Sequence, residues 1–391
     1  MIRLTNRHII TLVILLFSAF CSAQQLPTDG KLTIDSATQK LAKRLLKNKQ
    51  GSIVALNPST GEIICMVSHN KIYDGINRAI SMTYSPGSTF KTAQALTLLS
   101  ENELSPWTSY KCNKGFWQDN IHIGCHQHDS PLDLVQAIGQ SCNSYFCKAF
   151  RNFIDDRVKY STKYSALRRW HRYMISMGLG KPLGIDMQGE LSGEIPDSSF
   201  LDRKNNGRWN GTTIMWMGMG QGEVTTTPLQ LCNLAALIGN RGWYITPHIH
   251  ANTTEAPLDS MYIRRHYCIV REKAFKTVIG GMRAAVINGT CAGINTQAYK
   301  ICGKTGTAEN EGNDHSIFMG FAPMDNPKIA VSVYVENGGF GADLAAPLAS
   351  LVMEQFITGK LSQRSKRHAY QWENYKVKIT PVEIPINLDD L

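Results

Sequence analysis

Apolar residues recur at helical spacing in several separate parts of the chain. Residues 32–47 combine serine and aspartate capping residues with apolar positions three and four apart, which predicts an amphipathic helix. Further helices are expected where apolar stretches are bounded by glycine, proline or polar residues. They cover residues 88–99, 131–139, 144–154, 228–238 and 344–356. Much of the middle of the chain is therefore expected to be helical.

Short β-branched apolar runs predict strands near both ends of the chain. SIVAL and EIICMVS are separated by NPSTG, which indicates a β-hairpin. Three more strands are expected over residues 298–303, 316–322 and 329–336. Strands at both ends with helices between them predict an α/β fold of the α+β type. In such a fold one sheet is completed by both terminal regions and flanked by helices.

The first 25 residues have the pattern of an export signal. Two arginines precede an apolar run over residues 9–20, and small residues follow at the expected cleavage position. The run is shorter than the roughly 20 residues that span a bilayer, which favours a removed signal and leaves membrane association open. We therefore expect a signal peptide or short membrane anchor over 1–25, a main domain over 26–360 and a charged tail over 361–391.

The composition changes this picture little but restricts the partners. The 391 residues are 43% hydrophobic and 18% charged, which is enough for a large core and is not typical of disorder. The net charge of +10 is spread over several segments, as on a solvated basic surface. Such a surface would suit an acidic envelope polymer or anionic lipid headgroups. The export signal and the absence of a recognised binding motif argue against nucleic acid as a partner.

A serine and a lysine stand three residues apart at the start of one expected helix. In the sequence Ser88-Thr89-Phe90-Lys91, both functional side chains would share a helix face, so Ser88 Oγ and Lys91 Nζ are expected within hydrogen-bonding reach. Lysine can activate a serine nucleophile when burial lowers its pKa. The helix N-terminus adds N–H groups where an oxyanion would form. By itself this short pattern is weak, because a capping serine followed by lysine often arises by chance.

Two further patterns complete a set of three. They are Ser141-Cys142-Asn143 and Lys304-Thr305-Gly306. Serine enzymes that act on β-lactams and wall peptides combine all three patterns in this order. In such a site Ser141 can relay a proton between Lys91 and a leaving amine, and the Asn143 amide can hold a carbonyl of the bound peptide. The structural alternative for Asn143 is a helix cap.

The third pattern supplies groups that suit a substrate carboxylate and an oxyanion. Lys304 provides positive potential for the carboxylate, which the Thr305 and Thr307 hydroxyls can bind. Gly306 would let substrate approach the strand backbone, and the Thr307 N–H would be the second oxyanion donor beside that of Ser88. Ordinary β-propensity is the structural alternative for both threonines.

With these motifs the chain resembles the penicillin-binding transpeptidases, most closely the class B enzymes of the elongation type. The matching segments are LTIDSATQKLA, GSIVALNPSTGEIICMVS, NRAISMTYSPGSTFK, SCNSYF, GIDMQGELSGEIP, GMGQGEVTTTPLQL, GKTGTAEN and GFAPMDNPKIAVSVYVENG. The resemblance implies a β-lactamase/transpeptidase-like fold with a five-stranded antiparallel sheet, as a penicillin-binding transpeptidase domain over residues 26–360.

The resemblance also implies an activity. Ser88 would be acylated by the D-Ala-D-Ala end of a peptidoglycan stem peptide and would pass the acyl group to an amine on a neighbouring strand. β-Lactams would acylate the same serine, and the chemistry would require no cofactor. The expected location is the periplasm or the outer face of the cytoplasmic membrane.

One departure from the family affects the expected partners. Relatives of this type usually carry an N-terminal pedestal domain and a membrane anchor, whereas the matching segment here begins almost directly after the expected signal. This puts in doubt the contacts with a glycan polymerase and other cell-wall synthesis proteins that the resemblance otherwise implies. The active-site prediction is unchanged.

Four residues near the second pattern predict a structural zinc site. They are Cys112, Cys125, His128 and Cys142. Three thiolates and one imidazole satisfy tetrahedral Zn²⁺, and the placement resembles a metal site of some elongation-type relatives. Such a site would brace the loop that carries Ser141 and Asn143. A Cys112–Cys125 disulfide, simple buried thiols and His126 as the imidazole remain alternatives.

Other functions share part of this pattern. A class D-like β-lactamase also uses a Ser-Thr-Phe-Lys sequence, but typically has an aliphatic residue in place of Asn143 and a shorter span to K-T-G. Here 216 positions separate Ser88 from Lys304. A D,D-carboxypeptidase and a non-catalytic wall-binding module are the remaining alternatives, although the retained catalytic residue types argue against the second.

Overall fold

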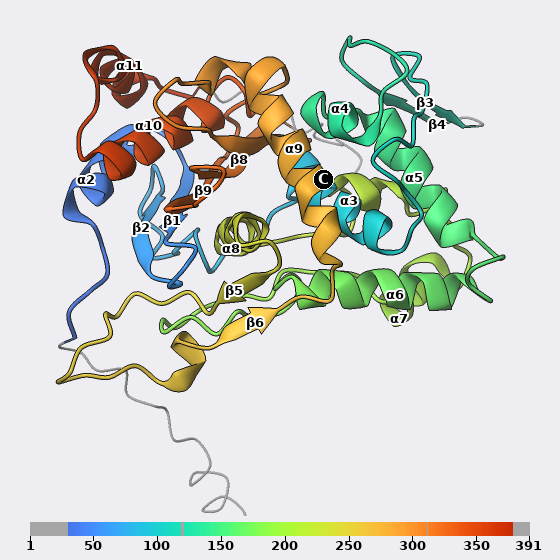
Figure 1. Ribbon diagram of the computed structural model, residues 1–391, viewed down its shortest axis with the longest axis horizontal. Helices are drawn as coiled ribbons and strands as arrows, with labels where there is room; N and C mark the ends of the chain where they lie inside the picture. Colours follow the sequence, from blue (N-terminus) through green and yellow to red (C-terminus); the bar gives the residue numbers. More distant parts are fainter. Residues whose placement is uncertain (1–29, 119–120, 311, 378–391) are drawn as a thin grey trace, which may run out of the picture.

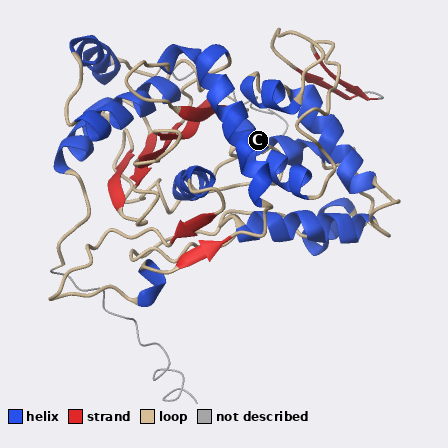
Figure 2. Cartoon of the chain, in the orientation of Figure 1, coloured by secondary structure: helices blue, strands red, loops and turns tan. Residues whose placement is uncertain are grey.

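The computed structural model describes residues 30–118, 121–310 and 312–377 (Figure 1). The export segment predicted over residues 1–25 lies outside the described residues, as does the end of the tail from residue 378. Within the described part, one central sheet is flanked by helices (Figure 2). None of the described helices combines the length and the apolar character needed to cross a bilayer.

The central sheet has five antiparallel strands, as predicted. They are β1 (Gly51–Leu56), β2 (Ile63–His69), β7 (Cys302–Ala308), β8 (His315–Ala322) and β9 (Ile329–Val335), arranged β2-β1-β9-β8-β7. Gly51 at the start of β1 pairs with Val335 at the end of β9. Both terminal regions of the domain thus complete one sheet, and Figure 1 shows the blue hairpin beside the orange strands.

One strand prediction was wrong in position. The apolar pattern indicated residues 298–303, whereas β7 runs from Cys302 to Ala308 and contains the K-T-G pattern. Thr305 of β7 pairs with Phe318 of β8. Since pairing with β8 holds the backbone extended, this polar, glycine-containing segment forms a strand although it lacks an apolar run. The third pattern therefore lies on an edge strand of the sheet.

The sheet divides the core into two layers. Successive residues of β9 point to opposite faces: Val331 and Val333 pack with apolar residues of α2 and α10, and Ala330 and Tyr334 face the layer that contains α8. These helices are α2 (Ser36–Leu46), α10 (Ala345–Thr358) and α8 (Pro228–Gly239). Because both faces are covered, the strands other than β7 are largely apolar without alternation.

The remaining elements are a helical region beside β7, two small two-stranded sheets, and a last helix, which lies against α2 and α10. They are η1 (Gly87–Phe90), α3 (Lys91–Ser100), β3 (Gly115–Gln118), β4 (Ile121–Gly124), α4 (Leu134–Gly139), α5 (Asn143–Asp155), α6 (Lys163–Ser176), α7 (Ser198–Asn205), η2 (Met215–Met219), β5 (Trp243–Ile245), η3 (Ser260–Tyr262), β6 (Arg265–Tyr267), α9 (Glu272–Asn288), η4 (Ala292–Ile294) and α11 (Gln363–Asn374). Asp35 and Asp133 cap α2 and α4, so both helices begin later than predicted.

Helix α11 was not predicted. The sequence after residue 361 lacks an apolar period, yet residues 363–374 are helical. The helix is held by polar contacts with the end of α2: Lys49 Nζ donates to Trp372 O at 2.5 Å, and Arg44 pairs with Glu373 at 2.8 Å. Helices anchored by capping and ion pairs give little periodic signal.

Candidate active site

The three sequence patterns meet at one cavity of about 880 Å³. Its lining includes Ser88 from η1, Ser141 from the turn before α5, Asn143 from the start of α5, and Thr305, Gly306 and Thr307 from β7. The two lysines of the patterns, Lys91 and Lys304, are fully buried next to these residues. Segments that are far apart in the chain therefore converge, as the sequence analysis predicted.

Ser88 lies in a tight turn that packs against the edge of β7. Gly87 has φ of +53°, and a Cβ atom there would lie 2.6 Å from Thr307 O. Only glycine combines this backbone conformation with so close an approach. Gly87 N also donates to Gly220 O at 2.9 Å. The half-buried Ser88 is therefore held between β7 and the segment after η2.

Gly306 has a packing reason that the sequence analysis did not foresee. A Cβ atom at this position would lie 3.0 Å from Pro86 O and 3.0 Å from Thr89 Cγ2. Both atoms belong to the segment that carries Ser88. The absence of a side chain at Gly306 thus lets the Ser88 turn approach β7. That Gly306 also lets substrate approach the strand backbone stays a prediction.

The amine of Lys91 is bound by the second pattern. Nζ lies 2.8 Å from Ser141 O, 3.3 Å from Ser141 Oγ and 2.5 Å from Asn143 Oδ1. Complete burial lowers the pKa of Lys91 to about 8. Among the described residues Lys91 Nζ makes no hydrogen bond to the Ser88 hydroxyl. The expected direct contact is therefore replaced by a link from Lys91 to Ser141.

The second pattern is itself held in an uncommon conformation. Ser141 has φ of +54°, in the left-handed region that non-glycine residues seldom adopt. Asn143 Nδ2 donates to Gly124 O at 2.8 Å, while its oxygen accepts from Lys91. The amide expected to hold a substrate carbonyl thus also connects Lys91 to the end of β4.

Lys304 lies close to Lys91 inside the protein. Its Nζ donates to Thr305 O at 3.0 Å. Burial, and then the neighbouring charge of Lys91, lower the pKa of Lys304 to about 7. Two buried ammonium groups destabilise each other, so an uncharged amine becomes accessible near neutral pH. This is the form that a base for Ser88 requires.

The free edge of β7 presents backbone groups toward Ser88. Thr307 O accepts a hydrogen bond from Gln221 Nε2 at 3.3 Å, on the side away from β8. The N–H and C=O of one residue in an antiparallel strand point to the same side. A Cβ atom on Gly87 would lie 3.2 Å from Thr307 N. The Thr307 N–H is therefore placed beside the Ser88 turn, where a second oxyanion donor is expected.

Several lining residues were not found from the sequence. Thr290 lines the cavity and accepts a hydrogen bond from Thr305 Oγ1 at 2.7 Å. Trp216, Gln221 and Phe340 also line it. All four reach the cavity through tertiary packing, and only Gln221, which lies in the matching segment GMGQGEVTTTPLQL, offered a signal in the sequence.

The four predicted zinc ligands form a cluster. The ligand atoms of Cys112, Cys125, His128 and Cys142 all lie within 4.8 Å of one another. Cys125 Sγ and Cys142 Sγ are 4.0 Å apart, and the cysteines of the described residues are all unpaired, so the alternative Cys112–Cys125 disulfide is not formed. His126 is not part of the cluster and lines the cavity instead.

The imidazole of His128 has one nitrogen that is available to bind a metal ion. Its Nε2 is buried without a hydrogen-bond partner, whereas Nδ1 lies 2.7 Å from Asp129 O. This is the arrangement of a metal-binding histidine whose second nitrogen is held by a backbone carbonyl. Ser144 N donates to Cys125 Sγ at 3.2 Å. Since Ser144 follows Asn143, the cluster adjoins the turn of the second pattern.

Comparisons with known proteins agree with this geometry. The family model of the penicillin binding protein transpeptidase domain matches residues 51–354. The peptidoglycan D,D-transpeptidase MrdA of Haemophilus influenzae is 30% identical over 86% of this chain and 57% of its own length. MrdA of Acinetobacter baumannii is 28% identical, over 92% of this chain and 59% of its own length. The chain thus spans less than two thirds of these curated relatives.

Solved structures give the same result. Pseudomonas aeruginosa PBP2 in complex with WCK 5153 has a TM-score of 0.74 at 31% identity, covering 86% of this chain and 81% of that chain. A structure titled for the coordination of polymerization and crosslinking by a peptidoglycan synthase complex has a TM-score of 0.73 at 27% identity. It covers 85% of this chain and 63% of that chain.

Proposed function

Because the chain belongs to the penicillin-binding protein transpeptidase family, we propose that it is a serine-type peptidoglycan D,D-transpeptidase that forms wall-peptide cross-links and is acylated by β-lactams. The observation that carries the proposal is the position of Ser88, which lies on the cavity between the edge of β7 and the buried Lys91–Ser141 pair. The names of the MrdA relatives support the same activity.

Acylation uses groups that are already close together. Ser88 Oγ attacks the carbonyl carbon of the penultimate D-Ala, and its proton passes through Ser141 to the uncharged amine of Lys91. The N–H groups of Ser88 and Thr307 stabilise the oxyanion. The C–N bond then breaks, and the leaving D-Ala amine takes its proton back from Lys91 through Ser141.

Cross-linking reverses these proton transfers. An amine of a second stem peptide attacks the acyl carbon and its proton passes to Lys91 through Ser141; the ester bond then breaks, and Ser88 Oγ takes this proton back, which restores both residues. The hydroxyls of Thr305 and Thr307, which line the cavity, would hold the terminal carboxylate of the donor peptide, and the charged form of the buried Lys304 would add positive potential behind them. Water in place of the amine would give D,D-carboxypeptidase activity at the same site.

The Cys112, Cys125, His128 and Cys142 cluster supports a structural zinc ion. Three thiolates and the unpartnered His128 Nε2 are a complete tetrahedral set, so no position is left for water or substrate. The ion would supply rigidity and no chemistry. It would fix the turn in which Ser141 and Asn143 receive the Lys91 amine.

The expected location and partners follow from the substrate. Peptidoglycan stem peptides lie outside the cytoplasmic membrane, so the protein would act in the periplasm or on the outer face of that membrane. One matched structure is titled as a peptidoglycan synthase complex, which supports other cell-wall synthesis proteins as partners.

Covalent labelling with a fluorescent penicillin tests the proposal. We expect intact-mass analysis of the full chain to show one adduct, located on Ser88, and Ser88→Ala to show none. Ser59→Ala, in the exposed turn after β1, is the matched control and keeps the adduct. An unlabelled wild type, or equal labelling of Ser88→Ala, would refute the proposal. Fast turnover of a chromogenic β-lactam, instead of a single burst, would indicate a β-lactamase.

A further inference from the structure

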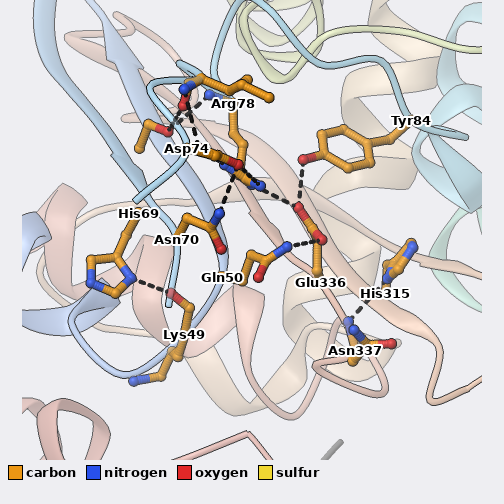
Figure 3. A network of polar contacts seen from close by, with 12 residues as sticks. Lys49, Gln50, His69, Asn70, Asp74, Arg78, Tyr84, His315, Glu336 and Asn337 are labelled. Atoms are coloured by element: carbon orange, nitrogen blue, oxygen red, sulfur yellow. Dashed lines mark hydrogen bonds and ion pairs between the residues drawn. The ribbon is translucent and has the colours of Figure 1, made fainter. Parts of the chain in front are cut away.

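A largely buried carboxylate lies at the junction between the sheet and the segment that leads to Ser88 (Figure 3). Glu336 directly follows β9, and its side chain is 13% exposed. Its Oε1 accepts hydrogen bonds from Arg78 Nε at 3.0 Å and from the Tyr84 hydroxyl at 2.7 Å. Its Oε2 accepts from Gln50 Nε2 at 2.6 Å. The carboxylate therefore joins the start of β1 to the Ser88 segment.

Arg78 fixes the position of this carboxylate. Its guanidinium is 6% exposed and lies between two acids, with Asp74 bound through both terminal nitrogens at 3.1 and 2.7 Å. The backbone N–H of Arg78 also donates to Ser68 Oγ at 2.8 Å, which restrains the main chain at this residue. A buried carboxylate needs such a compensating charge. Glu336 is therefore bound by Arg78 of the segment that leads to Ser88 as well as by Gln50 next to the sheet.

Tyr84 is the point where this network reaches the Ser88 segment. Besides its bond to Glu336, its ring stacks on Tyr334 with centroids 4.2 Å apart. Its backbone N–H and C=O both bond to Thr226, at 2.9 and 2.8 Å. Only three residues separate Tyr84 from Ser88. Tyr84 is therefore the residue of this network that lies nearest to the nucleophile along the chain.

We propose that Glu336 is a positioning residue for the nucleophile: by fixing Tyr84 it holds the Ser88 turn against the edge of β7. This inference rests on the proposed acylation of Ser88. The tolerance at this contact is small, since a Cβ atom on Gly87 would lie 2.6 Å from Thr307 O. Misplacing a reacting group by about 1 Å can slow a reaction about 100-fold.

Glu336 also begins a wall of the cavity. The loop that follows it includes Phe340 and Gly341, which line the cavity. A Cβ atom on Gly341 would lie 2.4 Å from Gly306 O, so this loop packs directly on β7. Glu336 thus lies where two parts of the cavity wall meet. Its side chain contacts Tyr84, near the Ser88 turn, and its backbone leads into the loop that packs on β7.

A second network, in which a glutamate again accepts hydrogen bonds from an arginine and from tyrosine hydroxyls, provides a control. Glu101, at the other end of α3, accepts hydrogen bonds from the hydroxyls of Tyr160 and Tyr173, both at 2.6 Å, and from Arg169 Nε at 2.8 Å. Its side chain is 8% exposed. None of these four residues lines the cavity. Loss of one tyrosine hydroxyl there removes the same interaction far from the proposed nucleophile.

The test compares Tyr84→Phe with Tyr160→Phe in the full chain. The concentration dependence of fluorescent-penicillin labelling separates the acylation rate constant from the dissociation constant of the first, non-covalent complex. We expect Tyr84→Phe to lower the rate constant about tenfold with an unchanged dissociation constant. Tyr160→Phe should lower the thermal midpoint to a similar extent and leave the rate constant within about twofold.

Each other outcome overturns the inference. A wild-type rate constant in Tyr84→Phe, or an equal decrease in Tyr160→Phe, would show that Glu336 contributes stability alone. A wild-type chain that is not labelled at all would overturn the proposed function and the positioning role together, so the two failures are distinguishable.

Substitutions of Glu336 itself add a conservative rescue. Glu336→Gln keeps an oxygen for the Tyr84 hydroxyl, whereas Glu336→Leu removes it. We expect the rate constant to fall about 100-fold in Glu336→Leu and to be restored to within about tenfold in Glu336→Gln. If Glu336→Leu does not fold, the comparison of Tyr84→Phe with Tyr160→Phe still tests whether Glu336 positions the nucleophile. Equal decreases in the two Glu336 variants would contradict a role through Tyr84.

Discussion

The two sides of the cavity are built in different ways. The sheet wall, formed by Thr305, Gly306 and Thr307 of β7, is fixed by strand pairing with β8. The helical wall, formed by Ser141 and Asn143, is fixed by side chains that converge on the buried amine of Lys91 and by the adjoining cysteine cluster. Backbone pairing needs no particular side chain, whereas the helical wall depends on a few. Single substitutions should therefore act unequally on the two walls.

Removing the amine that joins the helical wall should have the largest effect. Lys91→Ala eliminates the proposed base and leaves Ser141 and Asn143 without their shared donor, so we expect the acylation rate constant to fall about 1,000-fold. Stopped-flow labelling with fluorescent penicillin measures this change.

The chain offers a matched control for this variant. Lys49 is also buried, its pKa is lowered to about 8 by burial, and it donates to carbonyl groups of α2 and α11. Lys49→Ala should lower the thermal midpoint and keep the acylation rate. A comparable loss of rate in Lys49→Ala would mean that removing any buried lysine slows acylation, whether or not it belongs to the helical wall.

Loss of the proposed metal should weaken the helical wall next. In protein that contains one zinc ion per chain, a chelator or Cys142→Ser should lower the thermal midpoint and slow acylation on the order of 10-fold to 100-fold. Elemental analysis and labelling check both effects. Cys268→Ser, outside the cluster, should retain the metal. A chelated chain that acylates at the normal rate would show that the cluster does not support Ser141 and Asn143.

The charge of Lys91 should make acylation depend on pH. Its pKa of about 8 lies below the usual lysine value because of burial. The uncharged amine therefore increases as pH rises through 8, and the acylation rate constant should rise about tenfold between about pH 7 and 9. Rate measurements over this range test the sign. A rate that falls with rising pH would indicate that the charged form is the active one.

The sheet wall should tolerate the loss of a side-chain bond. Gln221→Leu removes the donor to Thr307 O, but pairing with β8 still holds β7 in place. We expect a change in acylation rate of less than about threefold and a stability loss of about 1 kcal/mol. Labelling kinetics and thermal unfolding measure these values. A decrease above about tenfold would mean that the sheet wall also relies on side chains, which would remove the contrast.

The sequence predicted the parts of the site that lie in short motifs. The Ser88, Ser141 and Lys304 patterns could be found because each is compact and their order is characteristic. The five-stranded sheet was predicted as well, from runs such as SIVAL and from the family resemblance, because strands covered on both faces are continuously apolar.

What the sequence did not predict depends on tertiary contacts. The strand that carries Lys304 is polar and is held extended by β8, so its bounds were misplaced. Helix α11 is held by polar contacts with Lys49 and Arg44 and packs only Ala369 and Trp372 against the core, too few apolar residues to give a clear period. The sequence named His128 as the ligand but left His126 as an alternative, because side-chain direction, which puts His128 in the cluster and His126 at the cavity, depends on the fold.

The pairing of β1 with β9 has a consequence for the order of folding. β1 and β2 can form a local hairpin early, but the partner of β1 lies near the other end of the domain. Until β9 arrives, one edge of the hairpin has no strand beside it and is open to wrong pairing. Contacts between such distant segments slow folding. Chains interrupted before β9 should therefore associate with one another instead of folding.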